Sequence, residues 1–432
     1  MRILLLGAYG FIGSAIAREL IARGHEVAGL GRDCDYGRRI LPQLHWIEVD
    51  LAQMTPAERW RPLLEGQNVV VNASGLLQSG EGGSVETVQL NAIRALIEAC
   101  EAAGTKRFIQ ISAAGARQDS GYDFMETKAC ADALVEASSV SSLIIRPGLV
   151  IGRNSYGGSE LIRAAAIAPV SLEFPFRAPI QCIALTDVVE AVARNIELDG
   201  APSLCLDLVE GKQRSLEEIV TAHRIWLGVP QPRWSIMPPK WLLKMIGSMA
   251  DLFGRLGWRP PLRSNALRAL EAGVVGDPQQ ARLLLQREPL SLEATLASQP
   301  AGKQDRLHAR LALWQPLIIF SLFIMWAASG LATLFQLDRA ASILQIGSIG
   351  REAAYAVAVG GAWVDILLAA GLLWRRTVRP ALMAMIILTL LVYLLGGTMV
   401  LPGLWVDPLA PFAKALPATL LALVAYWLVE KR

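Results

Sequence analysis

A glycine-rich turn follows the first apolar run of the chain and restricts what the N-terminal part can fold into. The run Ile3 to Leu6 suits a buried parallel strand, and the next residues read GAYGFIG, residues 7–13. A helix-forming stretch, 14–23, follows. In this context the first glycine permits a tight turn, the second lets backbone N–H groups approach a phosphate, and the third lets the helix pack close to the strand. The pattern predicts a pyrophosphate at the positive end of the helix dipole.

Further apolar runs alternate with helix-forming stretches. The other predicted strands are 25–30, 46–51, 69–75 and 106–112, and a helix is predicted over 85–103. This alternation predicts an α/β fold with a Rossmann-type doubly wound parallel sheet. Asp50, near the end of the third strand, is placed to reach an adenine edge, and the turn 72–75 should lie near the cofactor.

The end of the second predicted strand bears on which dinucleotide is bound. An acidic residue there bonds the ribose 2′-OH of NAD, whereas an arginine suits the 2′-phosphate of NADP. Arg32 comes first, and Arg38 and Arg39 add positive charge nearby. We therefore expect NADP(H) to be preferred. Asp33, which could serve an NAD ribose, keeps NAD(H) as the alternative.

Three ordered motifs carry a family resemblance. They are NAIRALIEACEAAGTKRFIQIS (91–112), RPGLVIG (146–152) and LTDV (185–188). With the glycine-rich turn, they resemble the extended and atypical short-chain dehydrogenase/reductase (SDR) superfamily, in particular the branch that includes the nucleotide-binding accessory subunit of respiratory complex I. The resemblance covers residues 1–300 and implies an NAD(P)-binding domain. Its substrate side would be built from about 153–180 and 205–290.

The patterns and the resemblance together indicate the cofactor site. The predicted cofactor-binding residues are Gly7, Tyr9, Gly10, Phe11, Ile12, Gly13, Arg32, Asp50, Leu51, Asn72, Ala73, Ser74, Gly75, Asn91, Lys128 and Pro147. The histidines show no metal-ligand spacing, so we expect no metal.

The resemblance also implies catalytic residues. Reductases of this superfamily use a serine and a Tyr-x-x-x-Lys motif, in which the lysine lowers the tyrosine pKa and the tyrosine exchanges a proton as hydride moves. Ser112 and Lys128 match this pattern, but Phe124 stands at the tyrosine position. Tyr122 is either a substitute catalytic group or an ordinary loop aromatic. The departure leaves cofactor binding untouched, because the family's lysine also bonds the nicotinamide ribose.

The last part of the chain predicts an all-α four-helix transmembrane domain, residues 313–432, after a linker at 301–312. Each apolar segment approaches the ~20 residues that span a bilayer. The predicted spans are about 313–335, 354–374, 381–401 and 409–428. The arrangement resembles the DoxX-like family of small membrane proteins.

Positive charges near the spans predict the orientation. Arg306 and Arg310 precede the first span, a three-arginine loop (Arg375, Arg376, Arg379) joins the second to the third, and Lys431 and Arg432 end the chain. These positions share one side, so we expect the N-terminal domain and the C-terminus to be cytoplasmic. The expected location is the inner membrane of a bacterium, in a multi-pass arrangement.

Two features have alternative interpretations, and a third segment has one. Asp365 lies inside the second span, where a carboxylate is costly; it either has a proton or quinone role or is bonded to a hydroxyl such as Thr389 or Thr398. The basic amphipathic helix 241–256 either packs on the Rossmann domain or lies on a membrane surface. The tract 290–304 is predicted to be a linker.

These observations favour a membrane-anchored oxidoreductase that takes a quinone or another lipid-soluble substrate. The alternative is a nucleotide-binding structural, assembly or sensing protein without turnover, and a membrane-protein partner remains an option. The net charge of +3 over 432 residues does not favour a nucleic-acid partner.

Overall fold

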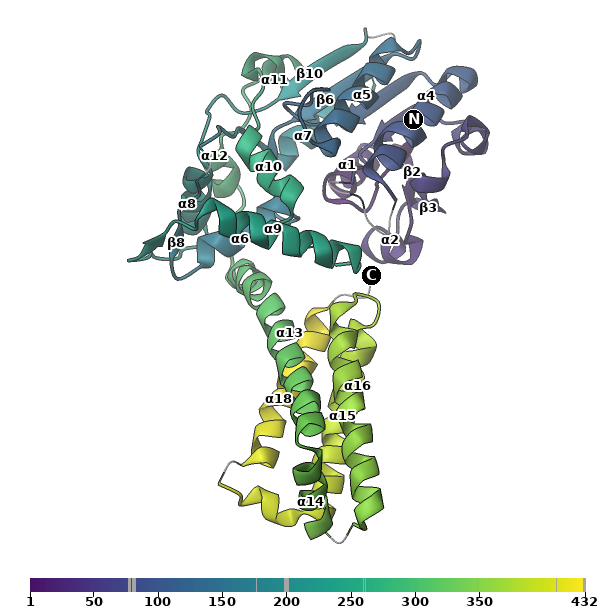
Figure 1. Cartoon of the computed structure of the whole chain (residues 1–432). Coiled ribbons are helices and arrows are strands. Elements are labelled where there is room, and N and C mark those ends of the chain that lie inside the picture. Colours follow the sequence, from purple (N-terminus) through teal and green to yellow (C-terminus); the bar gives the residue numbers. More distant parts are fainter. Residues whose placement is uncertain are drawn as a thin grey trace. The chain divides into compact units, whose positions relative to one another are not determined.

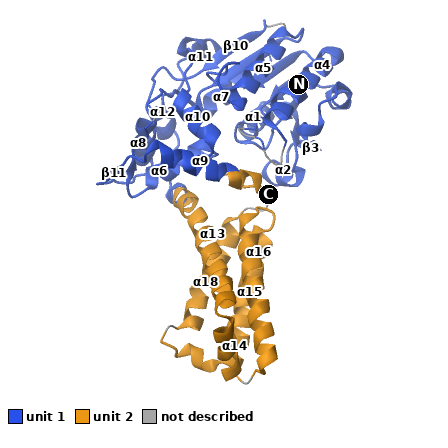
Figure 2. Ribbon diagram, viewed as in Figure 1, with its two compact units in different colours: residues 1–251, 261–306 blue, residues 252–260, 307–432 orange. Residues whose placement is uncertain are grey.

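The chain forms two compact units (Figure 2). The computed structural model describes residues 1–76, 79, 83–175, 177–197, 202–258, 260, 262–347, 349–408 and 410–429. Unit 1 comprises Met1–Asp251 and Pro261–Arg306, and unit 2 comprises Leu252–Pro260 and Leu307–Arg432. Helix α9 (Lys240–Arg255) and helix α13 (Lys303–Phe335) each belong partly to both units.

A seven-stranded sheet, parallel in every pairing, forms the centre of unit 1, in the order β10-β6-β5-β4-β1-β2-β3 (Figure 1). The parallel doubly wound sheet was predicted, but β6 and β10 were not among the five predicted strands. Its strands are β1 (Arg2–Leu6), β2 (Glu26–Gly31), β3 (His45–Glu48), β4 (Val69–Asn72), β5 (Arg107–Ile111), β6 (Ser142–Pro147) and β10 (Leu204–Leu208). The chain leaves β1 toward β2 and β3 and returns to β4 on the other side. This reversal makes the β1–β4 boundary the topological switch point, where doubly wound sheets bind ligands.

Helices cover both faces of the sheet because each contributes one apolar face. Ile16 and Leu20 of α1 and Val188 of α7 join the core on one face. Ile93 and Leu96 of α4 join the core on the other face. The helices of unit 1 are α1 (Phe11–Ala22), α2 (Cys34–Ile40), α3 (Arg61–Leu64), α4 (Ala92–Ala103), α5 (Asp123–Ala137), α6 (Gly158–Ile167), α7 (Leu185–Asn195), α8 (Leu216–Trp226), α9, α10 (Ser264–Ala272), α11 (Pro278–Leu285) and α12 (Leu292–Ala297).

Short elements complete unit 1. Strand β7 pairs with β9, and β8 pairs with β11, each in parallel. They are β7 (Leu149–Ile151), β8 (Ser171–Leu172), β9 (Cys182–Ala184), β11 (Ser235–Ile236), the 3₁₀ turns η1 (Leu51–Gln53) and η2 (Ala57–Arg59), and the π-helical turn η3 (Thr87–Asn91).

Side-chain hydrogen bonds end two of the predicted strands, the third of them earlier than the apolar pattern indicated and the fourth where the predicted 72–75 turn begins. The third ends at Glu48 because the Asp50 carboxylate accepts a hydrogen bond from the Ala52 N–H and starts the turn η1. The fourth ends at Asn72, whose side-chain oxygen accepts from the Ser74 N–H at 3.0 Å. In both places a side chain satisfies a backbone donor and competes with the sheet.

The tract 290–304, predicted to be a linker, is instead structured. Ser291 caps α12, and Leu292, Thr295 and Leu296 are buried. Glu293 pairs with Arg214 at 2.6 Å. From Lys303 onward the chain is helical and continuous with the first apolar span, so the predicted 301–312 linker is mostly helix.

Unit 2 contains four helices long and apolar enough to cross a membrane among the described residues: Lys303–Phe335, Arg351–Leu373, Val378–Val400 and Pro411–Leu428. Its elements are α13, α14 (Leu337–Ile346), α15 (Arg351–Leu373), α16 (Val378–Leu388), the π-helical segment η4 (Thr389–Gly396), α17 (Gly397–Val400), η5 (Pro402–Trp405) and α18 (Pro411–Leu428). Leu409, Lys431 and Arg432, used in the predicted span and orientation, lie outside the described residues.

Candidate cofactor and catalytic site

The turn between β1 and α1 has the geometry of a phosphate cradle. Gly7 adopts a φ of 72°, and its carbonyl accepts from the Gly10 N–H at 2.8 Å. A Cβ atom at Gly13 would lie only 2.2 Å from the Gly7 carbonyl oxygen. Gly10 is the N-cap of α1, and no side chain caps that helix end. The first turn of α1 therefore keeps its N–H groups for a ligand, which fits a pyrophosphate.

This cradle lies at the switch point of the sheet. A Cβ atom at Gly7 would lie 2.8 Å from the carbonyl oxygen of Ala73, which follows β4. On the other side, the Phe11 ring would lie 3.1 Å from a Cβ atom at Gly152, which follows β7. Ile12 is half-buried against the core. The predicted residues 7–13 and 72–75 are thus brought together.

The end of β2 is shaped by Tyr9. Its hydroxyl accepts from the Arg32 N–H at 3.2 Å, and its ring occupies the space that a Cβ atom at Gly31 would need. Asp33 caps α2 by accepting from the Tyr36 N–H at 2.8 Å. The Arg32 side chain is exposed and has no ion pair among the described residues, whereas Arg38 pairs with Asp35. Arg32 therefore keeps its guanidinium for an anion.

A buried polar cluster lies where β4, β5 and α5 meet. The Asn72 amide donates to Gln110 Oε1 at 2.8 Å, and the Ser74 hydroxyl donates to Asn72 Oδ1 at 2.5 Å. The ammonium of Lys128 donates to the carbonyls of Ile111 at 2.8 Å and Ser74 at 3.3 Å. A Cβ atom at Gly75 would lie 3.8 Å from Lys128 Nζ. Lys128 is thereby held beside the predicted cofactor turn.

The surroundings of Lys128 alter its acidity. The side chain is almost fully buried, and burial lowers the pKa of Lys128 from 10.5 to about 8, although the Asp132 carboxylate opposes the shift. A lysine in this state remains mainly protonated at neutral pH but releases its proton more readily than a surface lysine. That property suits a group that holds a ribose hydroxyl beside a site of proton transfer.

Ser112 takes part in a network that the sequence patterns did not reveal. Its hydroxyl donates to Asp132 Oδ2 at 2.7 Å, and Arg146 Nε donates to the same oxygen at 2.8 Å. Burial raises the pKa of Asp132, while its bonds to Ser112 and Arg146 limit that rise. Asp132 lies four residues after Lys128, one helical turn along α5, and Arg146 immediately precedes the predicted Pro147. These two positions in the sequence were the only features that could have predicted the bonds of Asp132 to Ser112 and Arg146.

The aromatic residues before Lys128 do not restore the family's tyrosine. Helix α5 begins at Asp123, so Tyr122 is its N-cap and Phe124 stands one turn before Lys128. The Tyr122 hydroxyl is buried and has no hydrogen-bond partner among the described residues. Burial also raises the pKa of Tyr122. A phenol in this environment resists ionisation and is therefore a weaker acid than a solvent-exposed tyrosine.

The remaining predicted cofactor residues occupy varied positions. Asp50 and Leu51 form the half-buried start of η1, Asn91 ends the π-helical turn η3, and Pro147 ends β6. The Asp50 carboxylate is already used in capping. Gln89, which the sequence analysis missed, is buried and donates to the Leu76 carbonyl at 3.1 Å and to Thr127 at 3.3 Å.

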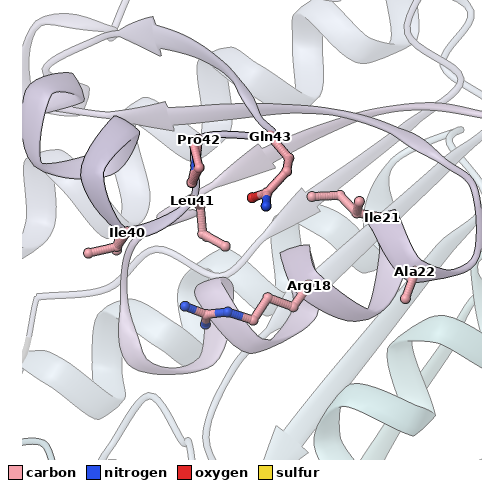
Figure 3. Close-up of a pocket in the computed structure, with 7 residues that line it drawn as sticks. All are labelled: Arg18, Ile21, Ala22, Ile40, Leu41, Pro42 and Gln43. Carbon is pink, nitrogen blue, oxygen red and sulfur yellow. The ribbon is translucent and has the colours of Figure 1, made fainter.

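A separate depression lies near the C-terminal end of α1, away from the cradle (Figure 3). Its volume is about 290 Å³, and it is lined by Arg18, Ile21, Ala22, Ile40, Leu41, Pro42 and Gln43. None of these residues was predicted to bind the cofactor.

A polar cluster lies inside unit 2. The Ser329 hydroxyl donates to Asp365 Oδ2 at 2.6 Å, and the Tyr393 hydroxyl donates to Oδ1 at 2.9 Å. The predicted partners Thr389 and Thr398 are wrong, because their hydroxyls donate to the carbonyls of Met385 and Leu394 in their own helical turns.

Two family models match the chain. An NAD(P)H-binding model matches residues 7–164, and a DoxX-like model matches residues 323–424. The chain joins an NAD(P)H-binding domain to a DoxX-like domain. Both predicted resemblances are therefore confirmed.

Several curated proteins resemble parts of this chain. Ceramide reductase of Caulobacter vibrioides is 28% identical over 202 residues, 47% of this chain and 62% of that protein, so the chain spans less than two thirds of this relative. Sterol demethylase protein B of Methylococcus capsulatus is 25% identical over 344 residues, 71% of this chain and 99% of that protein. The mouse mitochondrial NADH dehydrogenase [ubiquinone] 1 alpha subcomplex subunit 9 is 29% identical over 158 residues, 34% of this chain and 40% of that protein.

Solved structures support the fold. The Bordetella bronchiseptica enzyme WbmH, crystallised with NAD⁺, superposes with a TM-score of 0.52 at 16% identity, over 72% of this chain and 97% of that one. At this identity the likeness concerns the fold alone.

Proposed function

We propose that this chain is a membrane-anchored oxidoreductase that uses NADPH and acts on a lipid-soluble substrate. The observation that carries the proposal is the position of Lys128, a buried ammonium group beside the 72–75 turn, which in turn touches the phosphate cradle at Gly7. One site thus combines an anion-binding helix end with a cation that can hold a ribose hydroxyl.

The preference for NADPH rests on Arg32 and Asp33. Arg32 offers an exposed guanidinium, which pairs well with a 2′-phosphate. The Asp33 carboxylate is engaged as the cap of α2 and is less available to an NAD ribose. NADH remains the alternative cofactor.

The residues of the chain define what they can contribute to the reaction. The bound dinucleotide would supply hydride to a carbonyl carbon, and the carbonyl oxygen would then need a proton. Lys128 would position the nicotinamide ribose, and the Ser112 oxygen, fixed by its bond to Asp132, would help to orient the substrate. With Phe124 in place of the usual tyrosine, the proton would come from Tyr122 or from a water relayed by Lys128.

The substrate class follows from the membrane anchor and from the relatives. The names of two relatives contain ceramide and sterol, which are lipids. The name of the third relative, a subunit of NADH dehydrogenase, contains ubiquinone. A tether holds the site close to bilayer substrates and raises their effective concentration. A lipid carbonyl and a quinone are the two substrates to test. We place unit 1 on the cytoplasmic side of a bacterial inner membrane because of Arg306, Arg310 and the arginine loop at 375–379.

A second candidate is a nucleotide-binding sensor or assembly protein without turnover. Phe124 favours it, since the family's proton donor is missing at that position. A membrane-protein partner would suit this role.

Turnover measurements separate the two. The full-length protein in lipid nanodiscs is supplied with NADPH and with one candidate substrate at a time: a ubiquinone of varied chain length, the ketone form of a ceramide, or the ketone form of a sterol. The oxidation of NADPH is then followed. The proposal expects turnover that falls at least tenfold in Ser112→Ala and Lys128→Met. Phe124→Tyr, which restores the motif, should raise the rate. Tight NADPH binding without turnover in the wild type and in Phe124→Tyr would favour the second candidate.

A further inference from the structure

Helix α9 has two apolar faces, and among the residues that the structure describes only one of them is buried. Leu243, Gly247 and Ala250 are buried. A Cβ atom at Gly247 would lie 2.9 Å from the Leu267 side chain, so α9 packs closely on α10. Leu243 and Leu267 form a small core with the half-buried Phe174, Leu262 and Leu270. This buried face therefore holds α9 against unit 1 without any contribution from the other face.

The second face is exposed. Trp241, Met245, Met249 and Leu252 recur at spacings of four, four and three residues, so they form one stripe along the helix. Trp241 is 66% exposed and Met249 is 51% exposed. The segment before the helix adds Trp234, 74% exposed, with Ile236 and Met237. We name these seven residues the α9 patch. Exposed apolar side chains gathered along one helix face, with charged residues beside them, are typical of an interaction site.

Basic residues border the α9 patch. Lys240, Lys244 and Arg255 are exposed and, at 100° per residue, fall on one flank of the apolar stripe. Arg233 adds a further exposed charge. The acidic residue on this flank, Asp251, is paired with Arg263 at 3.0 Å. An apolar stripe with tryptophan and a lysine-rich flank matches a helix that lies in the headgroup region of an anionic bilayer.

The chain itself leads α9 to the membrane unit. The segment that directly follows α9 belongs to unit 2, where the Leu256 carbonyl accepts from the Arg375 N–H at 3.0 Å. Trp258 Nε1 donates to the Leu373 carbonyl at 2.7 Å, and the Arg375 guanidinium lies 5.6 Å from the Trp258 ring centre. Leu373 is the last residue of α15, one of the helices able to cross a membrane. The C-terminal end of α9 is thus a few residues from the end of a membrane span.

We infer that the α9 patch is an interfacial membrane contact: the apolar stripe enters the headgroup region and the basic flank binds anionic lipid phosphates. This contact would hold unit 1 against the bilayer surface. It does not rest on the proposed reaction, because it concerns the outer surface of α9 and not the cofactor cradle.

A depth measurement on the full chain tests the inference. An environment-sensitive fluorescent amino acid replaces Met245 or Met249 by codon suppression, which spares the native cysteines. The matched control is the same substitution at Leu283 of α11, an apolar residue that is 71% exposed. Helix α11 lies at the other end of unit 1 from α9 (Figure 1). Each protein is placed in nanodiscs of phosphatidylcholine with 30% phosphatidylglycerol, with or without a lipid that carries a nitroxide near the headgroup.

We expect nitroxide quenching at positions 245 and 249 to exceed that at 283 at least twofold. Quenching at 245 and 249 should also weaken in phosphatidylcholine alone and in the Lys240→Gln/Lys244→Gln variant. Equal quenching at all three positions would overturn the inference. Quenching at 245 and 249 that is the same with and without phosphatidylglycerol would overturn the role assigned to the basic flank. Shielding that appears only with two chains per disc would assign the α9 patch to a second copy instead of lipid.

Discussion

Replacement of Lys128 by methionine should change how the stability of unit 1 depends on pH. Burial lowers the pKa of Lys128 from 10.5 to about 8 in the folded protein. Between these values the unfolded chain binds a proton at this position and the folded chain does not, so stability rises with pH. Below pH 8 both states carry the charge, and the full cost of its burial opposes folding.

The size of this effect follows from the two pKa values. At about 1.4 kcal/mol per pH unit, the shift corresponds to about 3 kcal/mol between pH 8 and pH 10.5. The methionine variant has no such titration at this position. The difference in unfolding free energy, wild type minus variant, should therefore rise by about 3 kcal/mol across this window.

The assay is denaturant unfolding of the full-length protein in detergent from pH 7 to pH 10.5. Helix α5 and the sheet are followed by hydrogen exchange so that unit 1 is reported separately from the membrane helices. A wild-type-minus-variant difference that stays constant from pH 8 to pH 10.5 would refute the claim that Lys128 is a buried ammonium group. The bonds from Lys128 to Ile111 and Ser74 would then not define its environment.

Three further predictions concern the cofactor and the membrane unit. Arg32→Gln should raise the dissociation constant for NADPH, measured by calorimetry, about ten- to hundredfold and leave that for NADH within about twofold. The control is Arg38→Gln, because Arg38 pairs with Asp35. An equal loss of affinity for both cofactors would argue against a 2′-phosphate contact. Gly13→Ala should abolish binding of either cofactor, since the new Cβ atom would lie 2.2 Å from the Gly7 carbonyl, whereas Gly158→Ala, with open space around its Cβ position, should bind normally. Tyr393→Phe should destabilise unit 2 by about 1–3 kcal/mol, because a buried oxygen of the Asp365 carboxylate loses its hydrogen-bond donor. The assay is thermal unfolding in detergent, with Thr389→Ala as the control. An unchanged melting temperature would contradict the bond from Tyr393 to Asp365.

The sequence was sufficient for the parts of the fold that depend on local pattern. Residues 7–13 predicted the turn because the glycine positions, the strand before and the helix after all agree. The parallel sheet and the four helices long and apolar enough to cross a membrane followed from periodicity and length, and the start of each predicted span moved by only a few residues except at the first. There the helix begins at Lys303, since polar residues before the apolar segment continue the same helix.

Contacts between distant segments could not be read in the same way. Ser112 was recognised, but its partner Asp132 required the packing of α5 against β5. Asp365 was recognised as costly in a membrane, and the alternatives were a proton or quinone role or a bond to a hydroxyl such as Thr389 or Thr398. The structure selects Ser329 from another helix and Tyr393 from the π-helical segment η4, because a threonine inside a helix bonds its own preceding carbonyl. The tract 290–304 looked polar and loop-like, yet the Ser291 cap and the Arg214–Glu293 pair organise it.

The central claim is that unit 1 binds a nicotinamide dinucleotide with a preference for NADPH. Calorimetric titration of the purified full-length protein in detergent, with NADPH and NADH in separate experiments, tests this most directly. We predict a single site per chain, with NADPH bound at least about tenfold more tightly than NADH. If the folded protein gives no heat of binding with either NADPH or NADH, the claim is contradicted. The glycine turn would then be a purely structural feature.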